Sequence, residues 1–114
     1  MLDIKFESQG QPALCILQGR LDSNTAPDFE NRVLQDGVLQ GGVPLILDCA
    51  GLEYVSSAGL RVILLLVRKA TPMGIALGFA GLRSNVRSVL EISGMLGLLK
   101  THESVEAATV ALRS

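Results

Sequence analysis

The chain has 114 residues, of which 48% are hydrophobic and 18% charged, and its formal net charge is −1. This length suits one domain, residues 1–114, with a core that needs no metal or disulfide, and the composition is too apolar for a disordered chain. The charge argues against direct nucleic-acid binding, and the longest apolar run, residues 62–67, is too short for membrane insertion. The first residues carry no secretory signal and there are only two cysteines, so we expect a cytoplasmic protein.

The chain begins with a predicted β-hairpin. Apolar and polar residues alternate over residues 2–7, which is typical of a half-buried strand. Turn-forming residues at 8–12 lead into a second short strand at 13–18. We expect residues 19–24 to form a loop.

A helix is predicted after this loop. Thr25 with Asp28 three residues later resembles a capping box, and proline is tolerated in a first turn. The helix should run to about Leu39. Its inward face should carry Phe29 and Val33.

The middle of the chain predicts a strand that is buried on both faces. Residues 43–47 are short, continuous and mostly apolar, which favours parallel pairing. Asp48 is expected to end this strand, and a loop with Gly51 and Tyr54 to follow it.

The remaining predicted elements complete an alternation of helices and strands. The resulting order, β-β-α-β-α-β-α-β-α, predicts a single α/β domain whose mixed, mainly parallel sheet is opened by a hairpin and packed by four helices. In chain order these elements are a helix at 56–70, a strand at 75–80, a helix capped by Ser84, a short strand at Leu98 and Leu99, and a helix capped by Ser104 with Val105, Ala108 and Leu112 inside.

The junction at the start of the second helix is the most informative segment. Ser56 and Ser57 stand where free backbone N–H groups and a partial positive charge are expected, so a phosphoryl group there would be tolerated. It would add about 1.5 to 2 negative charges to the surface. The small Ala58 and Gly59 allow close packing or close approach by another protein. Taken alone, such serines are more often simple helix caps.

These residues resemble a known family. Residues 48–60, DCAGLEYVSSAGL, are similar to the signature of the STAS domain, and in particular of stand-alone bacterial anti-sigma-factor antagonists. In that signature a buried strand ends in Asp, a Gly-containing loop follows, and a serine-rich run opens a helix. Residues 19–22, GRLD, match the family's Gly-x-Leu-Asp before the first helix.

The resemblance implies a phosphorylation switch. The unphosphorylated antagonist would bind an anti-sigma factor that is also a serine kinase of the histidine-kinase-like ATPase type, which releases the sigma factor. The kinase would phosphorylate Ser57, the phosphorylated form would dissociate, and a serine phosphatase would reset it. Ser56, which stands where many members have Asp, is a second candidate acceptor. The expected partner-binding residues are Asp22, Asn24, Ser56, Ser57, Ala58, Gly59 and Arg61.

Other functions have less support in the sequence. Cys15 and Cys49 are expected to be buried thiols, and the lone His102, near a helix start, to lie on the surface without zinc ligands around it. We therefore expect no enzyme, metal or cofactor. Two alternatives stay open: a STAS subunit of a lipid-transport or sensory-signalling complex without a phosphorylation switch, and a small-ligand or nucleotide domain that uses a loop between Asp48 and Ser57.

Overall fold

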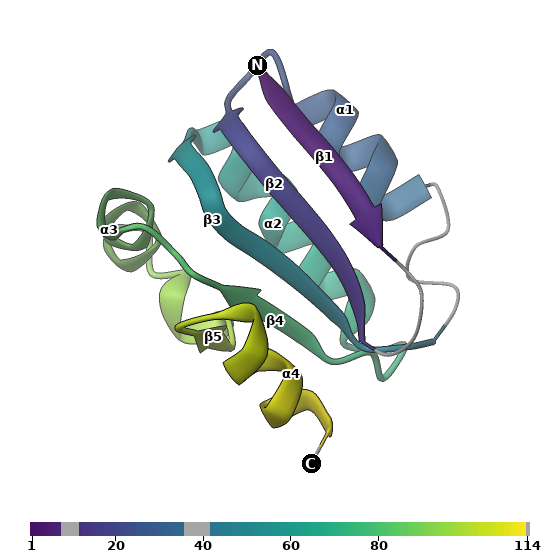
Figure 1. Ribbon diagram of the computed structural model, residues 1–114. Coiled ribbons are helices and arrows are strands. Elements are labelled where there is room, and N and C mark those ends of the chain that lie inside the picture. The colour runs from purple at the N-terminus through teal and green to yellow at the C-terminus, as the bar shows by residue number, and fades with distance from the viewer. Residues whose placement is uncertain (8–11, 36–41, 114) are drawn as a thin grey trace.

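The computed structural model describes residues 1–7, 12–35 and 42–113, and it shows one sheet with helices on both of its faces (Figure 1). This confirms the predicted α/β class and the predicted order of helices and strands. The five strands lie in the order β1-β2-β3-β4-β5. The first pair is antiparallel and the other pairs are parallel. The strands are β1 (Leu2–Glu7), β2 (Ala13–Leu21), β3 (Leu45–Val55), β4 (Leu77–Ala80) and β5 (Thr101–His102).

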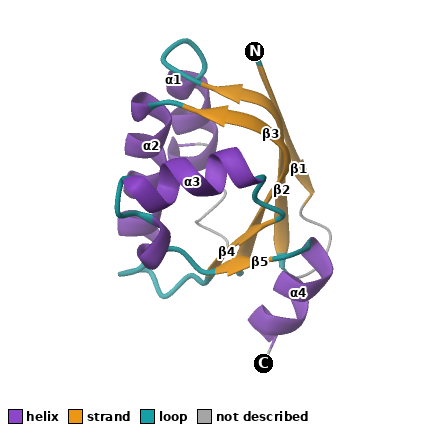
Figure 2. Cartoon of the chain, turned by 90° about the vertical axis from the view of Figure 1, so that its left-hand side faces the viewer, coloured by secondary structure: helices purple, strands orange, loops and turns teal. Residues whose placement is uncertain are grey.

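The helices divide between the two faces of the sheet. Figure 2 shows α1, α2 and α3 together on one face and α4 on the other. The predicted cap of α4 is confirmed, because the Ala107 N–H donates to Ser104 Oγ at 3.1 Å. The helical elements are α1 (Ala26–Glu30), a π-helix (Asn31–Gln35), α2 (Ser57–Ala70), α3 (Ser84–Ile92), a 3₁₀ turn (Leu96–Leu98) and α4 (Val105–Arg113).

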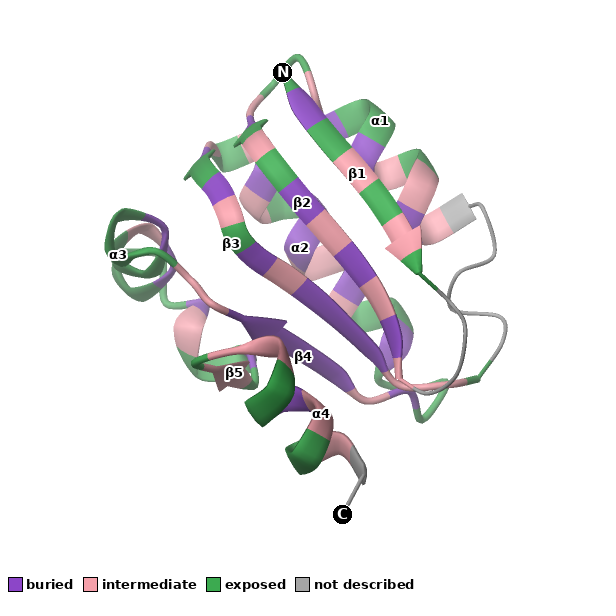
Figure 3. Cartoon of the chain, viewed as in Figure 1, coloured by how far each residue is buried: buried purple, intermediate pink, exposed green. Residues whose placement is uncertain are grey.

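The core lies between the sheet and the three helices on one face. Phe29 and Val33 are fully buried there, as predicted from their helical spacing. A smaller apolar cluster lies under α4, where Ile46 and Ala80 meet Ala108. The middle of the sheet is therefore covered on both sides, and Figure 3 shows buried residues in the first half of β3 and along β4. This explains why residues 43–47 lack the alternation of a half-exposed strand.

Strand β3 is longer than predicted, because Asp48 does not end it. The strand continues beside β2 until Leu21 lies opposite Val55, and the register shifts at two points along the way. Gly51 sits within this stretch, where a Cβ atom would lie 2.8 Å from Gln18 Cγ. The glycine thus marks a close approach of two strands and not a loop. The predicted loop at 19–24 is shorter for the same reason, since its first three residues belong to β2.

The start of α1 also differs from the prediction. Thr25 is the N-cap residue, but its side chain makes no capping bond, so the predicted capping box is wrong. Its hydroxyl donates to the Arg20 carbonyl at 2.8 Å, and the Thr25 N–H donates to Asp22 Oδ1 at 3.2 Å. The π-helix follows α1 directly. The predicted end near Leu39 lies outside the described residues.

Two predictions in the last third are wrong by a few residues. Ser84 is the first residue of α3, and Arg83 takes the N-cap position. The segment at Leu98 forms the 3₁₀ turn, and the last strand follows it at Thr101–His102. Short apolar runs do not distinguish a tight helical turn from a strand, which accounts for the second error.

Candidate functional site

The carboxyl ends of β2 and β3 bring the two predicted site segments together. The strands run in parallel, and the Ser56 N–H donates to the Leu21 carbonyl at 2.9 Å. Asp22 directly follows one strand, and Ser57 opens the helix that follows the other. The loop before α1 and the start of α2 therefore lie at the same edge of the sheet (Figure 2).

The two candidate serines have different surroundings. Ser56 is the extended N-cap residue of α2, is half-buried, and its Oγ accepts a hydrogen bond from the Gly59 N–H at 3.3 Å. Ser57 is exposed, and its hydroxyl makes no hydrogen bond to any residue that the structure describes. Ser56 therefore serves the helix, whereas the Ser57 oxygen is open to another molecule.

Gly59 has a structural reason for its small size. A Cβ atom at this position would lie 2.7 Å from Leu21 Cγ and 3.0 Å from the Leu21 carbonyl oxygen. The first turn of α2 thus rests directly on the end of β2. In this structure the close approach that Gly59 allows is to its own chain, at Leu21.

The other predicted partner-binding residues retain some contact with solvent. Asn24, Ser57 and Arg61 are exposed, whereas Asp22, Ser56 and Ala58 are half-buried.

The Asp22 carboxylate organises the loop before α1. Its Oδ1 accepts hydrogen bonds from the Asn24 N–H at 3.0 Å and the Thr25 N–H at 3.2 Å. Desolvation raises the pKa of Asp22, but these two bonds and one from the Thr25 hydroxyl outweigh it, so the pKa lies below its ordinary value. The Asp22 side chain is therefore negatively charged near neutral pH and orders the loop through these hydrogen bonds.

Arg61 belongs to an ion pair between two helices. Its Nη1 lies 3.2 Å from Glu30 Oε1, so it joins α2 to α1. The Arg61 side chain is 66% exposed and the Glu30 side chain 28% exposed, so this pair lies at the surface.

Sequence reasoning missed an aromatic contact beside the site. The Arg20 guanidinium lies 4.3 Å from the centre of the Tyr54 ring, and the two residues are opposite each other on β2 and β3. Tyr54 is 37% exposed. No periodic pattern marks Tyr54, and the expected loop gave no reason to place it opposite Arg20.

Two side chains at the start of α3 were also missed. Strand β4 ends where Ala80 lies opposite Asp48, so the rest of β3 has no strand on that side. Arg83 Nε donates to the Ala50 carbonyl at 2.8 Å, and Asn85 Nδ2 donates to the Glu53 carbonyl at 2.6 Å. These contacts satisfy backbone groups of β3, and no local sequence pattern identifies them because they depend on where α3 packs.

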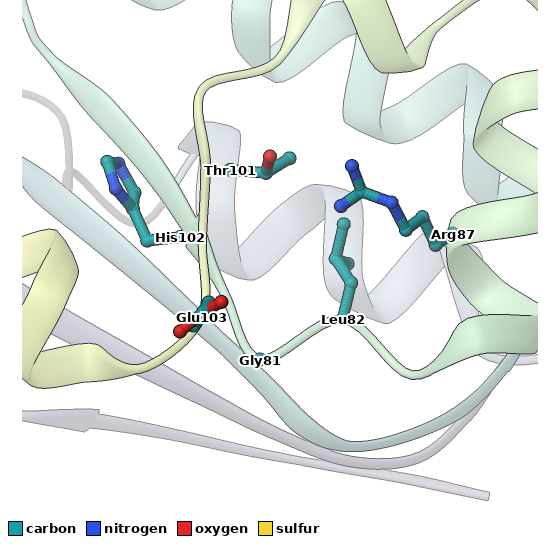
Figure 4. Close-up of a pocket in the computed structure, with 6 residues that line it drawn as sticks. All are labelled: Gly81, Leu82, Arg87, Thr101, His102 and Glu103. Atoms are coloured by element: carbon teal, nitrogen blue, oxygen red, sulfur yellow. The ribbon is translucent and has the colours of Figure 1, made fainter.

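A pocket of about 440 Å³ lies elsewhere on this edge, at the ends of β4 and β5. Figure 4 shows Arg87 of α3 extending toward Thr101, while the His102 ring turns away from them. The proposed ligand loop between Asp48 and Ser57 is instead mostly strand β3, so that alternative loses its structural basis. The pocket is lined by Gly81, Leu82, Arg87, Thr101, His102 and Glu103.

His102 lies just before α4, near a helix start as expected, but it is half-buried and not a surface residue. It lies on β5, and its ring would be 3.3 Å from a Cβ atom at Gly78. Its Nε2 is buried and makes no hydrogen bond among the described residues. The ring is buried because it packs on the face of the sheet that α4 covers, where Leu112 of α4 also lies close to Gly78.

The two thiols are buried and unpaired, as expected. Burial raises the pKa of Cys15 to about 12, and it raises the pKa of Cys49 as well. Neither thiol is therefore poised for thiolate chemistry. Within 1–7, 12–35 and 42–113, no group of three or more His, Cys, Asp or Glu residues could hold a metal ion. In the same ranges no helix is both long and apolar enough to cross a bilayer.

Comparison with known proteins agrees with this architecture. A protein of Bordetella bronchiseptica that carries the name anti-sigma factor antagonist BtrV is 36% identical over 101 residues, which cover 89% of this chain and 86% of that protein. The crystal structure of an anti-sigma factor antagonist from Mycobacterium paratuberculosis superimposes with a TM-score of 0.87 at 20% identity, covering 100% of this chain and 96% of that one.

The Bacillus protein SpoIIAA has the same fold. Its phosphorylated form has a TM-score of 0.71 at 18% identity, covering 96% of this chain and 99% of that one. The STAS domain profile itself matches residues 4–108, which is nearly the whole chain. The chain therefore belongs to the STAS domain family.

Proposed function

We propose that this protein is an anti-sigma factor antagonist whose unphosphorylated form binds an anti-sigma factor and thereby releases a sigma factor. The proposed partner is also a serine kinase of the histidine-kinase-like ATPase type. The observation that carries the proposal is the exposed Ser57 hydroxyl at the start of α2, beside the loop that Asp22 organises. The antagonist name of the 36% identical relative supports it. These partners act in the cytoplasm, where we expect this chain.

In the proposed switch this chain is a substrate and not an enzyme. The Ser57 oxygen attacks the γ-phosphorus of ATP, the bond from that phosphorus to the ADP oxygen breaks, and a base of the kinase takes the hydroxyl proton. A serine phosphatase later transfers the group to water and releases inorganic phosphate. The phosphoryl group is accommodated at the positive end of α2, because an anion near a helix N-terminus is stabilised by about 0.3 to 1 kcal/mol.

Charge and desolvation explain how the added group would change binding. A neutral hydroxyl is cheap to bury at an interface when it finds a hydrogen bond, whereas a dianion must lose its hydration and repels acidic groups of the partner. A penalty of about 2 to 4 kcal/mol lowers affinity by roughly 30-fold to 1000-fold. That range is enough to change a bound complex into a dissociated one.

The experiment that tests the proposal is phosphorylation with ATP and a candidate anti-sigma kinase. Intact mass should show one added phosphate, and fragment masses should assign it to Ser57. The Ser57→Ala variant should stay unmodified, whereas Ser56→Ala should be modified like the wild type. Modification at Ser56 would identify the other serine as the acceptor. No modification by any resident kinase, with stable capture by a transporter ATPase, would favour the subunit of a transport complex instead.

A further inference from the structure

We propose that Arg61 binds the phosphoryl group of phosphorylated Ser57 and leaves Glu30, so that an ion pair between α1 and α2 is replaced by one within α2. The inference rests on the proposed function, because it concerns the phosphorylated state of Ser57. In this inference a residue of the chain itself, Arg61, stabilises the phosphorylated state.

The positions of the two residues allow this exchange. Ser57 and Arg61 are four residues apart on α2, and side chains at that spacing lie on the same face of a helix, one turn apart. Ser57 is exposed and the Arg61 side chain is 66% exposed. The guanidinium can therefore turn toward Ser57 without unpacking any part of the core.

The present partner of Arg61 is easily displaced. The pair with Glu30 consists of one contact of 3.2 Å between side chains that both retain access to solvent. Water screens such exposed pairs strongly, and their net contribution is small. A phosphoserine offers about 1.5 to 2 negative charges and three acceptor oxygens, which the flat guanidinium can bind with two hydrogen bonds. The phosphoryl group should thus compete successfully with a single carboxylate.

Other basic side chains at this edge already have partners. Arg20 stacks on Tyr54 and lies 3.9 Å from Asp22. Arg83 donates to the Ala50 carbonyl at the opposite side of β3. Arg61 combines the spacing, the exposure and the weakly held contact that the exchange requires.

The exchange would spread the change of surface charge over both helices. In the unphosphorylated protein the positive Arg61 and the negative Glu30 balance each other on neighbouring helices. After the exchange, Arg61 faces the phosphoryl group, and Glu30 adds an uncompensated charge near the exposed Asp28 of α1. A partner that fits the balanced pair would then meet a surface that is negative on both helices.

The test places phosphoserine at position 57 during translation, so that no kinase is needed. The second ionisation of the phosphate is followed by ³¹P NMR at low salt in otherwise wild-type protein, in Arg61→Gln and in Arg68→Gln. Arg68 is an exposed arginine of the same helix, 11 positions from Ser57, so the control has the same change of charge without the neighbouring position. We expect the pKa of the phosphate to rise by about 0.5 unit in Arg61→Gln and to stay unchanged in Arg68→Gln.

A second measurement follows Arg61 directly. In the unphosphorylated protein the Nε–H resonance of Arg61 should shift when Glu30 is changed to Gln, and in the phosphoserine protein that response should be lost. Equal phosphate pKa values in wild type and Arg61→Gln, or equal rises in the two arginine variants, would overturn the inference. Neither result would bear on whether a kinase modifies Ser57, which the mass measurement decides separately.

Discussion

Two regions at the same edge of the sheet differ in the surface that they offer to another molecule. At the ends of β2 and β3 the surface presents the exposed Ser57 hydroxyl beside a loop ordered by hydrogen bonds to Asp22. At the ends of β4 and β5 it is hollowed into a pocket of about 440 Å³ that Arg87 enters. Small ligands bind in concave sites, whereas an exposed hydroxyl on an ordered surface suits modification by an enzyme and contact with a protein. The contrast favours the first region as the regulatory site.

The largest expected effect is on binding of the anti-sigma factor. Phosphoserine at position 57 should lower the affinity roughly 30-fold to 1000-fold, because the dianion must be desolvated in the complex. Ser57→Ala should bind at least as well as the unphosphorylated wild type. Affinities are measured by isothermal titration calorimetry.

A control for this prediction comes from the pocket. Ser57→Asp and Arg87→Gln each change the net charge by −1, but they lie in the two different regions. The first should weaken binding, and the second should leave it within about twofold of the wild type. An equal loss in both variants would mean that net charge and not the site governs binding, and the contrast between the regions would then fail.

The second prediction concerns the support beneath the serine. Gly59→Ala should destabilise the protein by about 1 to 3 kcal/mol, because its Cβ would lie too close to Leu21 and the end of β2 cannot move freely. Urea unfolding measures the change.

The matched control is Gly97→Ala. A Cβ atom at Gly97 would have no neighbour within 4 Å, and its backbone needs no left-handed conformation. That variant should be neutral or slightly more stable. If Gly59→Ala were equally well tolerated, α2 would not depend on close packing against β2.

The same packing shows what the sequence could and could not reveal. Local patterns predicted the buried face at Phe29 and Val33, the mainly parallel sheet and a helix that begins at Ser56 and Ser57, within one residue of the observed start. The length of β3 was missed, since Asp48 and Gly51 are typical of turns and only the neighbouring β2 keeps them in a strand.

The candidate site was predictable to a similar extent. The family resemblance implied that Asp22, Ser56 and Ser57 belong to one site, and the parallel strands bring them to one edge. The sequence did not reveal which serine is open, because that depends on the bond from the Gly59 N–H to Ser56. Nor did it reveal the Arg61–Glu30 pair, whose members are 31 positions apart.

The third prediction separates the two serines by stability. Ser56→Ala removes the side chain that accepts from the Gly59 N–H and should cost about 1 kcal/mol. Ser57→Ala should change stability by less than about 0.5 kcal/mol, since its hydroxyl makes no bond to the described residues. Thermal unfolding of the two variants gives the comparison. A larger loss in Ser57→Ala would show that the hydroxyl has a structural partner.

The smallest expected effect is a pH-dependent loosening of the loop before α1. The hydrogen bonds to Asp22 hold its pKa below the ordinary value of 3.8 despite the opposing effect of desolvation. The folded state therefore binds this proton less readily than the unfolded chain. The contribution of the carboxylate to stability is complete above the unfolded pKa and is lost as the pH falls through the folded-state value. An NMR titration should show the Asn24 and Thr25 amide resonances moving together below about pH 3.8.

Two variants decide whether Asp22 causes that movement. Asp22→Asn removes the titrating group while keeping an acceptor oxygen, so the two amide resonances should lose their pH dependence. Asp28→Asn, which removes an exposed carboxylate from the first turn of α1, should leave the titration in place. If Asp28→Asn abolished the pH-dependent shift of the two amide resonances instead, the loop would be responding to the carboxylate at the start of α1 and not to Asp22. The order of the loop beside Ser57 would then come from its connection to α1, and the hydrogen bonds to Asp22 would contribute less.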